Sequence, residues 1–495
     1  MNSLILKFTI ITIFAAIFAD IEIINLNPWM ELSSIGTGLL NPDFSVFWIY
    51  KFAIINTFTF AICGITLSVI LAIPLSLFFN IKIIRLFCSF IRSIHEIFWA
   101  FIILQLVGLN AVCGIISIAI PYAGIFAKVF HEIEEESIKI PKEVIPPNIN
   151  RFSIFIYYSL PIIIKDISNY IKYRLECAIR SSAILGFIGL PTVGFYLETA
   201  FREGLYSEMA SLLYIFFIII ALLKHIVKIK TIPILFIFSI YFISLEINFS
   251  LENFYRFFTY DILPWPIKKE GYYNNSYSID FNIIIVIKWM LNIIKTEGLI
   301  GIWNTIILTQ IGLFFTGIFA FISFPFATKK LTHPIIRRIS HTILIIFRTT
   351  PEYILAYLFL LLWGPSMLPA IFAIFIHNGA ILSFLTANNT NIIKIRFDNL
   401  NHKFNIFLYE ITPKISGQFF AFLFYRWEVI MRESAILGIL GIYSLGFYID
   451  SAISDHQLDK AMFLILITAI LNMIIDKISQ IIRKKYRISK KLTVT

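Results

Sequence analysis

Two stretches of the sequence are related to each other: YRLECAIRSSAILGFIGLPTVGFYL at 173–197 and YRWEVIMRESAILGILGIYSLGFYI at 425–449. They align without a gap, and 13 of the 25 positions are identical. The identical positions include charged residues and three glycines, which average composition alone would not repeat so often. Because a repeat determines the whole architecture, the pair predicts a chain built from two related halves.

The composition is that of a membrane protein. The chain has 495 residues, of which 58% are hydrophobic and 14% charged, against about 25% charged in a soluble domain. The net charge of +11 is carried largely by basic residues beside apolar segments, as the positive-inside rule expects, and does not indicate nucleic-acid binding. Four cysteines without CxxC spacing predict neither a disulfide framework nor a metal site, and no cofactor is expected.

Six membrane spans are expected in the first half of the chain. The segment 25–45 lacks basic residues and is placed outside, whereas Lys82, Arg85 and Arg92 mark the inside. A signal peptide is the rival interpretation of the first segment, but no cleavage site of the A-x-A kind follows it. The expected spans are 4–24, 47–79, 94–109, 111–128, the helix with the first repeated stretch, and 206–223.

The second half repeats this order and ends in a strongly basic tail. Its expected spans are 231–249, 299–327, 341–362, 366–386, the helix with the second repeated stretch, and 460–476. Two six-span halves that both start inside have the same orientation, so they form parallel repeats. We therefore expect an all-α polytopic membrane protein of about twelve helices. Its repeats cover 1–230 and 231–495, and both termini are cytoplasmic.

The repeated helix carries charges at the same positions in both copies. A charge in mid-membrane costs about 2.5–3.5 kcal/mol on insertion scales, so these side chains should face protein or water. One interpretation is a polar lining of a transport path, and the other is an i,i+4 Glu–Arg pair that holds helices together. The candidate path residues are Tyr173, Glu176, Arg180, Tyr425, Glu428 and Arg432.

Three glycines also recur in the repeated stretch. Glycine permits close contact between helices, and it also permits a broken helix beside a substrate path. Close packing at the seam between the halves is the favoured interpretation, and the broken helix stays open. The positions are Gly186, Gly189, Gly194, Gly438, Gly441 and Gly446.

A second short motif occurs in both halves, as Arg92-Ser-Ile-His-Glu96 and Arg348-Thr-Thr-Pro-Glu352. Ser93 with Glu96, like Thr349 with Glu352, has capping-box spacing at the start of a span, so helix capping explains it without any function. The sequence contains no G-x-x-x-x-G-K-[ST], so the chain is not expected to be an enzyme that hydrolyses ATP through a P-loop.

These two motifs resemble those of a known family. The segment RSIHEIFWA at 92–100 and the run YRLE…IRSSAILGFIG at 173–189 are similar to the permeases of phosphonate ABC importers, and both recur in the second half. The resemblance implies the type I importer permease fold. It also implies a solute path between two membrane halves, and a cytoplasmic loop in each half that docks on an ATPase. Two copies fused in one chain would supply both halves.

The docking loops depart from the family pattern. The family has E-A-x-x-x-x-G before a Leu-Pro, but here the corresponding positions hold Lys142 and Asn148 in the first half, and Lys394 and Leu400 in the second. The usual acidic contact is therefore absent. The loops 129–153 and 387–412 are still expected to contact the ATPase.

The resemblance thus implies the permease subunit of an ATP-driven importer in a bacterial inner membrane, for phosphonate or a related phosphorus oxyanion. Its expected partners are two ATP-binding-cassette subunits, a periplasmic or surface solute-binding protein, and the lipid bilayer. Three alternatives stay open: an importer permease for another small solute, a secondary transporter driven by an ion gradient, and a membrane assembly protein.

Overall fold

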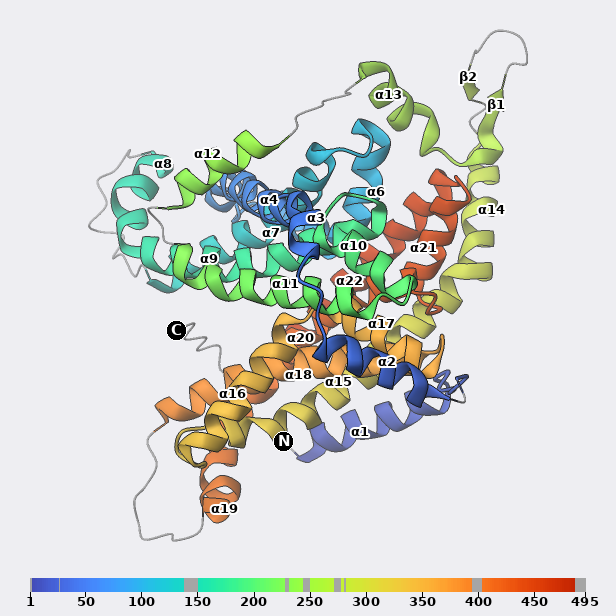
Figure 1. Cartoon of the computed structure of the whole chain (residues 1–495). Helices are drawn as coiled ribbons and strands as arrows, with labels where there is room; N and C mark the ends of the chain where they lie inside the picture. Colours follow the sequence, from blue (N-terminus) through green and yellow to red (C-terminus); the bar gives the residue numbers. More distant parts are fainter. Residues whose placement is uncertain are drawn as a thin grey trace. The chain divides into compact units, whose positions relative to one another are not determined.

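The computed structural model describes residues 2–25, 27–137, 150–227, 231–243, 250–270, 277–279, 282–393 and 403–485 (Figure 1). Nearly all of the regular structure in these residues is helical. The exception is a two-stranded antiparallel hairpin of β1 (Lys268–Glu270) and β2 (Tyr277–Ile279), in which Lys269 is opposite Ser278.

The chain folds into two compact units, called here unit A (residues 33–263) and unit B (residues 1–32 and 264–495). These packing units differ from the expected repeats 1–230 and 231–495 at both ends. The repeat boundaries themselves stay a prediction, because a unit of packing and a unit of duplication need not coincide. Each unit is described by itself.

The long helix α4 is central to unit A and packs against α7, α9 and α12. The helices α5 and α6 pack against α7, and α11 packs against α10. The sequence boundary between the units, after residue 32, falls within the helix α2 (Pro28–Leu40). The α-helices of unit A are α3 (Val46–Ile49), α4 (Lys51–Leu77), α5 (Lys82–Ser93), α6 (Glu96–Val107), α7 (Ala111–Ser137), α8 (Arg151–Ile154), α9 (Leu160–Ile184), α10 (Val193–Arg202), α11 (Tyr206–Ile226), α12 (Ile232–Phe242) and α13 (Leu251–Arg256).

Unit B has the corresponding arrangement around α15, which packs against α18, α20 and α1. Its core is apolar where α15, α18 and α20 meet, at Leu308, Ala370 and Ile430 among others. The α-helices of unit B are α1 (Asn2–Ile17), α14 (Ile283–Ile293), α15 (Leu299–Ala327), α16 (Pro334–Thr349), α17 (Glu352–Trp363), α18 (Met367–Ile392), α19 (Lys403–Asn405), α20 (Thr412–Ile439), α21 (Leu445–Ser454) and α22 (Leu458–Lys485).

Short 3₁₀ and π turns join or extend these helices. They are η2 (Phe155–Ser159), η3 (Leu185–Ile188), η4 (Phe257–Asp261), η5 (Trp265–Ile267), η6 (Ile294–Gly298) and η7 (Ile406–Ile411). One of them, η6, connects α14 to α15, so that residues 283–327 run as a single apolar helix.

Length and apolarity make the chain a multi-pass membrane protein. Among the described residues, five helices are long and apolar enough to cross a membrane, and eight segments qualify if each of three bent helix pairs counts as one span. Three shorter apolar helices, at Ile5–Ile17, Tyr206–Leu222 and Ile232–Phe242, fall below that length. The twelve spans expected from the sequence therefore stay a prediction.

Two of the bent pairs correct the expected spans. The sequence predicts one span over 341–362, but the chain turns through 91° between α16 and α17, at Thr350 and Pro351. The expected span 94–109 corresponds to α6, which meets α5 at 93° and has 12 residues. Twelve residues extend only about 18 Å, against about 30 Å of hydrocarbon, so α6 alone is too short to cross the bilayer.

Each sequence half contributes its first helix to the unit that the other half mostly forms: α1 packs in unit B, and α12 packs in unit A. Figure 1 shows α1 alongside α15, and the Gln310 side chain donates a hydrogen bond to Thr12 Oγ1 at 3.2 Å. The chain after α1 is tied to the turn between α17 and α18 by the bond from Ile24 N to Trp363 O, at 2.8 Å. Reciprocally, α12 packs against α4. Residues far apart in the sequence thus form one core.

The recurring glycines allow a broken helix to pack closely against itself within each unit. A Cβ on Gly194 would collide with the carbonyl oxygen of Ala183, and one on Gly446 would collide with that of Ala435. A Cβ on Gly186 or on Gly438 would likewise collide with the backbone at the start of the next helix. Gly189 and Gly441 have positive φ at the break. The glycines therefore allow α9 to pack closely against α10, and α20 against α21. Each of these contacts lies within one unit.

Candidate functional site: a buried polar cluster in each unit

The bends between α5 and α6 and between α16 and α17 each place a glutamate in the core of a unit. The residue before each bend is extended, with ψ of 133° at Ile94 and 120° at Thr350, so the helix cannot continue. In unit B the cause is Pro351, since proline disfavours helical geometry in the residue before it. The next helix then begins at Glu96 or Glu352, and both side chains are buried.

In unit A, Glu96 is surrounded by hydrogen-bond donors. His95 Nε2 lies 3.1 Å from its Oε2, and the Ser181 hydroxyl lies 3.3 Å from its Oε1. The Tyr122 hydroxyl contacts Ser181 Oγ at 3.2 Å. These side chains come from three segments: the bend, α7 and α9. One buried carboxylate is thus matched by several donors, as a polar group in a core requires.

In unit B the corresponding cluster contains two carboxylates. His377 Nε2 on α18 lies 3.5 Å from Glu352 Oε2, and the Asn378 amide donates to Glu433 Oε2 at 2.8 Å. In the described residues, Glu352, His377 and Glu433 each offer one ligand atom within 4.8 Å of the others. His377 and Asn378 are fully buried. The cluster joins the start of α17, the middle of α18 and the end of α20.

The first arginine of the repeated stretch has different hydrogen-bond partners in the two units. In unit A, Arg174 Nε donates to the Tyr170 hydroxyl at 2.8 Å, and the guanidinium lies over the Tyr170 ring at 5.2 Å. In unit B the equivalent Arg426 is buried, and its Nε and Nη2 have no hydrogen-bond partner in the described residues. For Nε the reason is in the sequence, because position 422 holds phenylalanine where the first copy has Tyr170.

The sequence-predicted path residues lie at mixed depths along their helices. In unit A, Tyr173 is exposed, and Glu176 and Arg180 are half-buried. Arg180 Nη2 contacts the Cys177 sulfur at 3.3 Å. In unit B, the Tyr425 ring lies 5.9 Å from the Arg483 guanidinium, Glu428 is buried and Arg432 is half-buried.

The capping box expected at Ser93 and Thr349 does not form. The Ser93 hydroxyl donates to the Phe90 carbonyl, and that of Thr349 to the Ile345 carbonyl, both in the preceding helix. The cap of α6 is His95, whose Nδ1 accepts from Ile97 N at 3.2 Å. The bend displaces the serine and threonine from the cap position. The glutamate side chains therefore lie in the polar clusters and do not form a capping box.

Four of the predicted residues belong to the docking loops. Lys142, Asn148, Lys394 and Leu400 lie outside the described residues. Their predicted contact with an ATPase stays a prediction.

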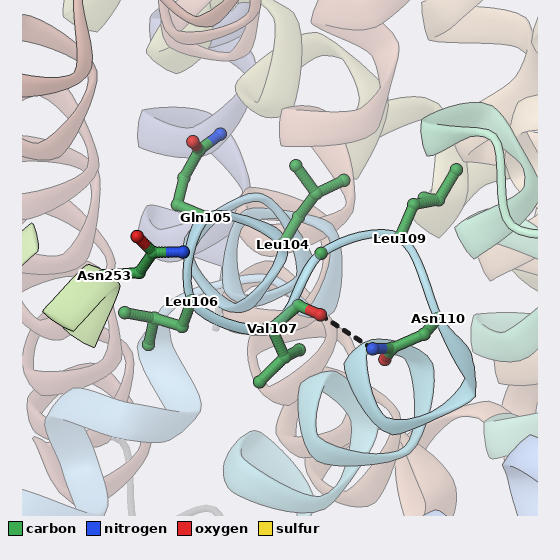
Figure 2. Close-up of a pocket in the computed structure, with 8 residues that line it drawn as sticks. Leu104, Gln105, Leu106, Val107, Leu109, Asn110 and Asn253 are labelled. Atoms are coloured by element: carbon green, nitrogen blue, oxygen red, sulfur yellow. Dashed lines mark hydrogen bonds between the residues drawn. The ribbon is translucent and has the colours of Figure 1, made fainter. Parts of the chain in front are cut away.

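A separate small pocket lies at the far end of α6. Figure 2 shows it around the turn Leu104–Asn110, with Asn253 of α13 on one side, and its volume is about 320 Å³. Asn110 uses its amide within the turn, donating to Val107 O at 2.7 Å and accepting from Cys113 N at 3.0 Å. None of the sequence-predicted site residues lines this pocket.

Sequence reasoning missed the residues at the centre of both clusters. Glu96 and Glu352 belong to a repeated motif, but its spacing predicts helix capping for them. Glu433 is not among the positions that the two copies share, because the first copy has Ser181 there. His377 and Asn378 lie in an apolar helix far away in the sequence, and their polarity within that helix was the one available signal.

The fold and these clusters define a class: a multi-pass membrane protein with charged groups buried in the core of each unit. The chain is similar to the phosphate-import permease protein PhnE of Mycolicibacterium smegmatis, with 23% identity over 34% of this chain and 33% of that protein. It is also similar to the phosphite transport system permease protein PtxC of Stutzerimonas stutzeri, with 23% identity over 40% of this chain and 75% of that protein.

A third relative is the putative cryptic phosphonate transport system permease protein PhnE2 of Escherichia coli K12, with 26% identity over 23% of this chain and 98% of that protein. The match to the Mycolicibacterium protein thus spans one third of its length. No family model and no solved structure matches the chain.

Proposed function

We propose that this chain is the membrane permease of an ATP-driven importer for a phosphorus oxyanion: phosphonate, phosphite or phosphate. The observation that carries the proposal is its similarity to three permeases of phosphate, phosphite and phosphonate transport. The relatives are named as transport permeases and not as enzymes, and this sequence has no P-loop. ATP hydrolysis therefore belongs to partner subunits.

The proposal extends to the architecture. The chain holds two parallel permease repeats of about six spans each, in a bacterial inner membrane with both termini in the cytoplasm. A contact that recurs at corresponding positions supports the duplication. Val193 N donates to Thr57 Oγ1 at 2.9 Å in unit A, and Leu445 N donates to Thr305 Oγ1 at 3.0 Å in unit B.

The proposed partners follow from the same class. Two ATPase subunits dock on the loops that contain Lys142 and Lys394, and a solute-binding protein delivers the anion from the other side. ATP binding then closes the two ATPases and moves the halves between outward-open and inward-open states.

The proposed transport path uses the repeated helices. Tyr173, Glu176, Arg180, Tyr425, Glu428 and Arg432 remain its candidate residues. We add Arg426 to them, because two N–H groups of its buried guanidinium have no hydrogen-bond partner in the described residues, and a tetrahedral oxyanion can accept from both.

The test is uptake by proteoliposomes that contain the chain, the ATPase that co-purifies with it from native membranes, and the matching binding protein. Uptake of radiolabelled phosphite, methylphosphonate and phosphate should require ATP inside, and sulfate should not compete. Arg180→Gln and Arg432→Gln should lower uptake per folded molecule while the ATPase still co-purifies.

Two outcomes of this experiment would contradict the proposal. Uptake that needs an ion gradient and no ATP would favour a secondary transporter. ATP-dependent uptake of a solute without phosphorus, with no competition by any of the three anions, would assign another substrate.

A further inference from the structure

The polar cluster of unit B has the composition of a cation site. One ligand atom from each of Glu352, His377 and Glu433 lies within 4.8 Å of the other two. Glu352 and His377 are buried, so bulk water does not solvate their charged forms. Two carboxylates in such a place need positive charge close by, because an ionised carboxylate is costly to remove from water without a partner.

The orientation of His377 leaves one ring nitrogen directed at the cluster. Its Nδ1 lies 2.8 Å from the Thr350 carbonyl oxygen and 3.3 Å from that of Phe347. Carbonyl oxygens only accept hydrogen bonds, so Nδ1 carries a proton, and in the neutral ring the lone pair is on Nε2. This Nε2 lies 3.5 Å from Glu352 Oε2. A backbone carbonyl that fixes the tautomer in this way is typical of a metal-ligating histidine.

Asn378 contributes a second, independent indication. Its amide nitrogen donates to Glu433 Oε2 at 2.8 Å, which places the same amide beside the carboxylates. Its Oδ1 is fully buried and accepts no hydrogen bond from the described residues. A buried amide oxygen without a donor is normally costly, but it is a suitable ligand for a cation.

Arg426 is a further charged group near the cluster. It precedes Glu433 by two turns on the same stripe of α20, and its charge acts on Glu433.

We propose that Glu352, His377 and Glu433 bind a divalent cation, with Asn378 Oδ1 as the fourth ligand. The mixture of imidazole and carboxylate ligands suits Zn²⁺ or Mn²⁺ better than Mg²⁺ or Ca²⁺, which prefer oxygen ligands alone. The cation would tie α17, α18 and α20 together at one point. It would also neutralise the carboxylates and leave Arg426 available to an anion. This inference concerns a resident ion and does not depend on the transported solute.

Unit A offers a built-in comparison. Ser181 stands where unit B has Glu433, and Tyr122 stands where it has Asn378, 14 residues after the glycine that ends the preceding helix in both units. Glu96 is therefore a single carboxylate, with the Ser181 hydroxyl and His95 Nε2 within hydrogen-bond distance. The proposal thus predicts one cation per chain, in unit B.

The experiment uses the full-length chain purified in detergent, stripped with a chelator and then titrated with Zn²⁺ or Mn²⁺. Metal content is measured by mass spectrometry, and Co²⁺ serves as a probe of coordination by its visible absorption. We expect one ion per wild-type chain. Glu433→Gln and His377→Gln should weaken binding by roughly tenfold or more, a loss that even a supporting residue of a metal site can cause. Glu96→Gln is the matched control and should bind as the wild type does.

Thermal unfolding provides the check on folding. The metal should raise the melting temperature of the wild-type chain and of Glu96→Gln, because it binds the folded state, and should leave that of Glu433→Gln unchanged. Absence of bound metal in the wild-type chain, or equal binding by Glu433→Gln, would overturn the proposal. The experiment does not measure transport, so its result does not depend on whether the proposed function is correct.

Discussion

Arg174 and Arg426 occupy the same position in the two copies of the repeated stretch, and a single hydroxyl makes their surroundings different. Tyr170 accepts a hydrogen bond from Arg174 one turn earlier in the helix, whereas Phe422 cannot do so for Arg426. A buried arginine stays charged, so unit B keeps a cation that has N–H groups to offer to a ligand.

Phe422→Tyr should therefore give Arg426 the partner that Arg174 already has. We expect a gain of about 1–2 kcal/mol in the free energy of unfolding, since hydrogen bonds to charged groups are among the stronger ones. Uptake per folded molecule should fall, because the new hydroxyl competes with the anion. Thermal unfolding and uptake measure the two effects.

The matched control for that change is Tyr170→Phe in unit A. It removes the corresponding hydroxyl and should lower stability by about 1 kcal/mol, because that contact is partly exposed. If Phe422→Tyr leaves uptake per folded molecule unchanged, Arg426 does not take part in transport.

At this scale the sequence predicted the charged residue types of the repeated helix but not the cluster of unit B. The comparison of the two copies drew attention to identical positions, and Glu433 is a position where they differ. His377 lies 25 residues from Glu352 and 56 from Glu433 in the sequence, so only the folded helices bring the three side chains together.

The bends between consecutive helices are the main difference between expectation and structure at the scale of elements. Hydropathy located α4, α15, α18 and α22 well, because each is one long apolar run. The same property could not detect the turn at Thr350 and Pro351, since apolarity is continuous through it while direction changes by 91°. Pro351 is the available signal, because proline disfavours helical geometry in the residue before it.

The broken helix α20–α21 supports a test of the glycine contacts. Gly446→Ala should destabilise the fold by about 2 kcal/mol or more, because the added Cβ meets the Ala435 carbonyl oxygen and backbone cannot yield as a side chain does. Melting of the purified variant measures this effect.

Gly417→Ala in the same helix is the control. A Cβ at Gly417 meets nothing within 4 Å, so this variant should be as stable as the wild type or gain up to about 1 kcal/mol. Equal stability of the Gly446→Ala and wild-type chains would contradict the assigned contact.

For the whole molecule, duplication has a consequence for stoichiometry. If one chain carries both permease halves, a purified complex should contain one copy of this chain and two ATPase subunits. Native mass spectrometry of the complex extracted from membranes measures the mass directly. Two copies of the chain in each complex would show that the repeats do not replace a dimer.

The packing of α1 in unit B and of α12 in unit A could not be predicted from the sequence. The apolar segments 4–24 and 231–249 read as ordinary first spans, and hydropathy carries no information on which helix will receive them. Packing decides this, through contacts such as that of Thr12 with Gln310.

That contact joins residues 298 positions apart, and this distance is also an interval of time. At about 5–20 residues per second, a ribosome needs about 15–60 s to reach Gln310 after it has made Thr12. During this interval α1 is already synthesised but its partner does not yet exist. The N-terminal helix must therefore wait in the insertion machinery or the lipid, and the core of unit B closes late in synthesis.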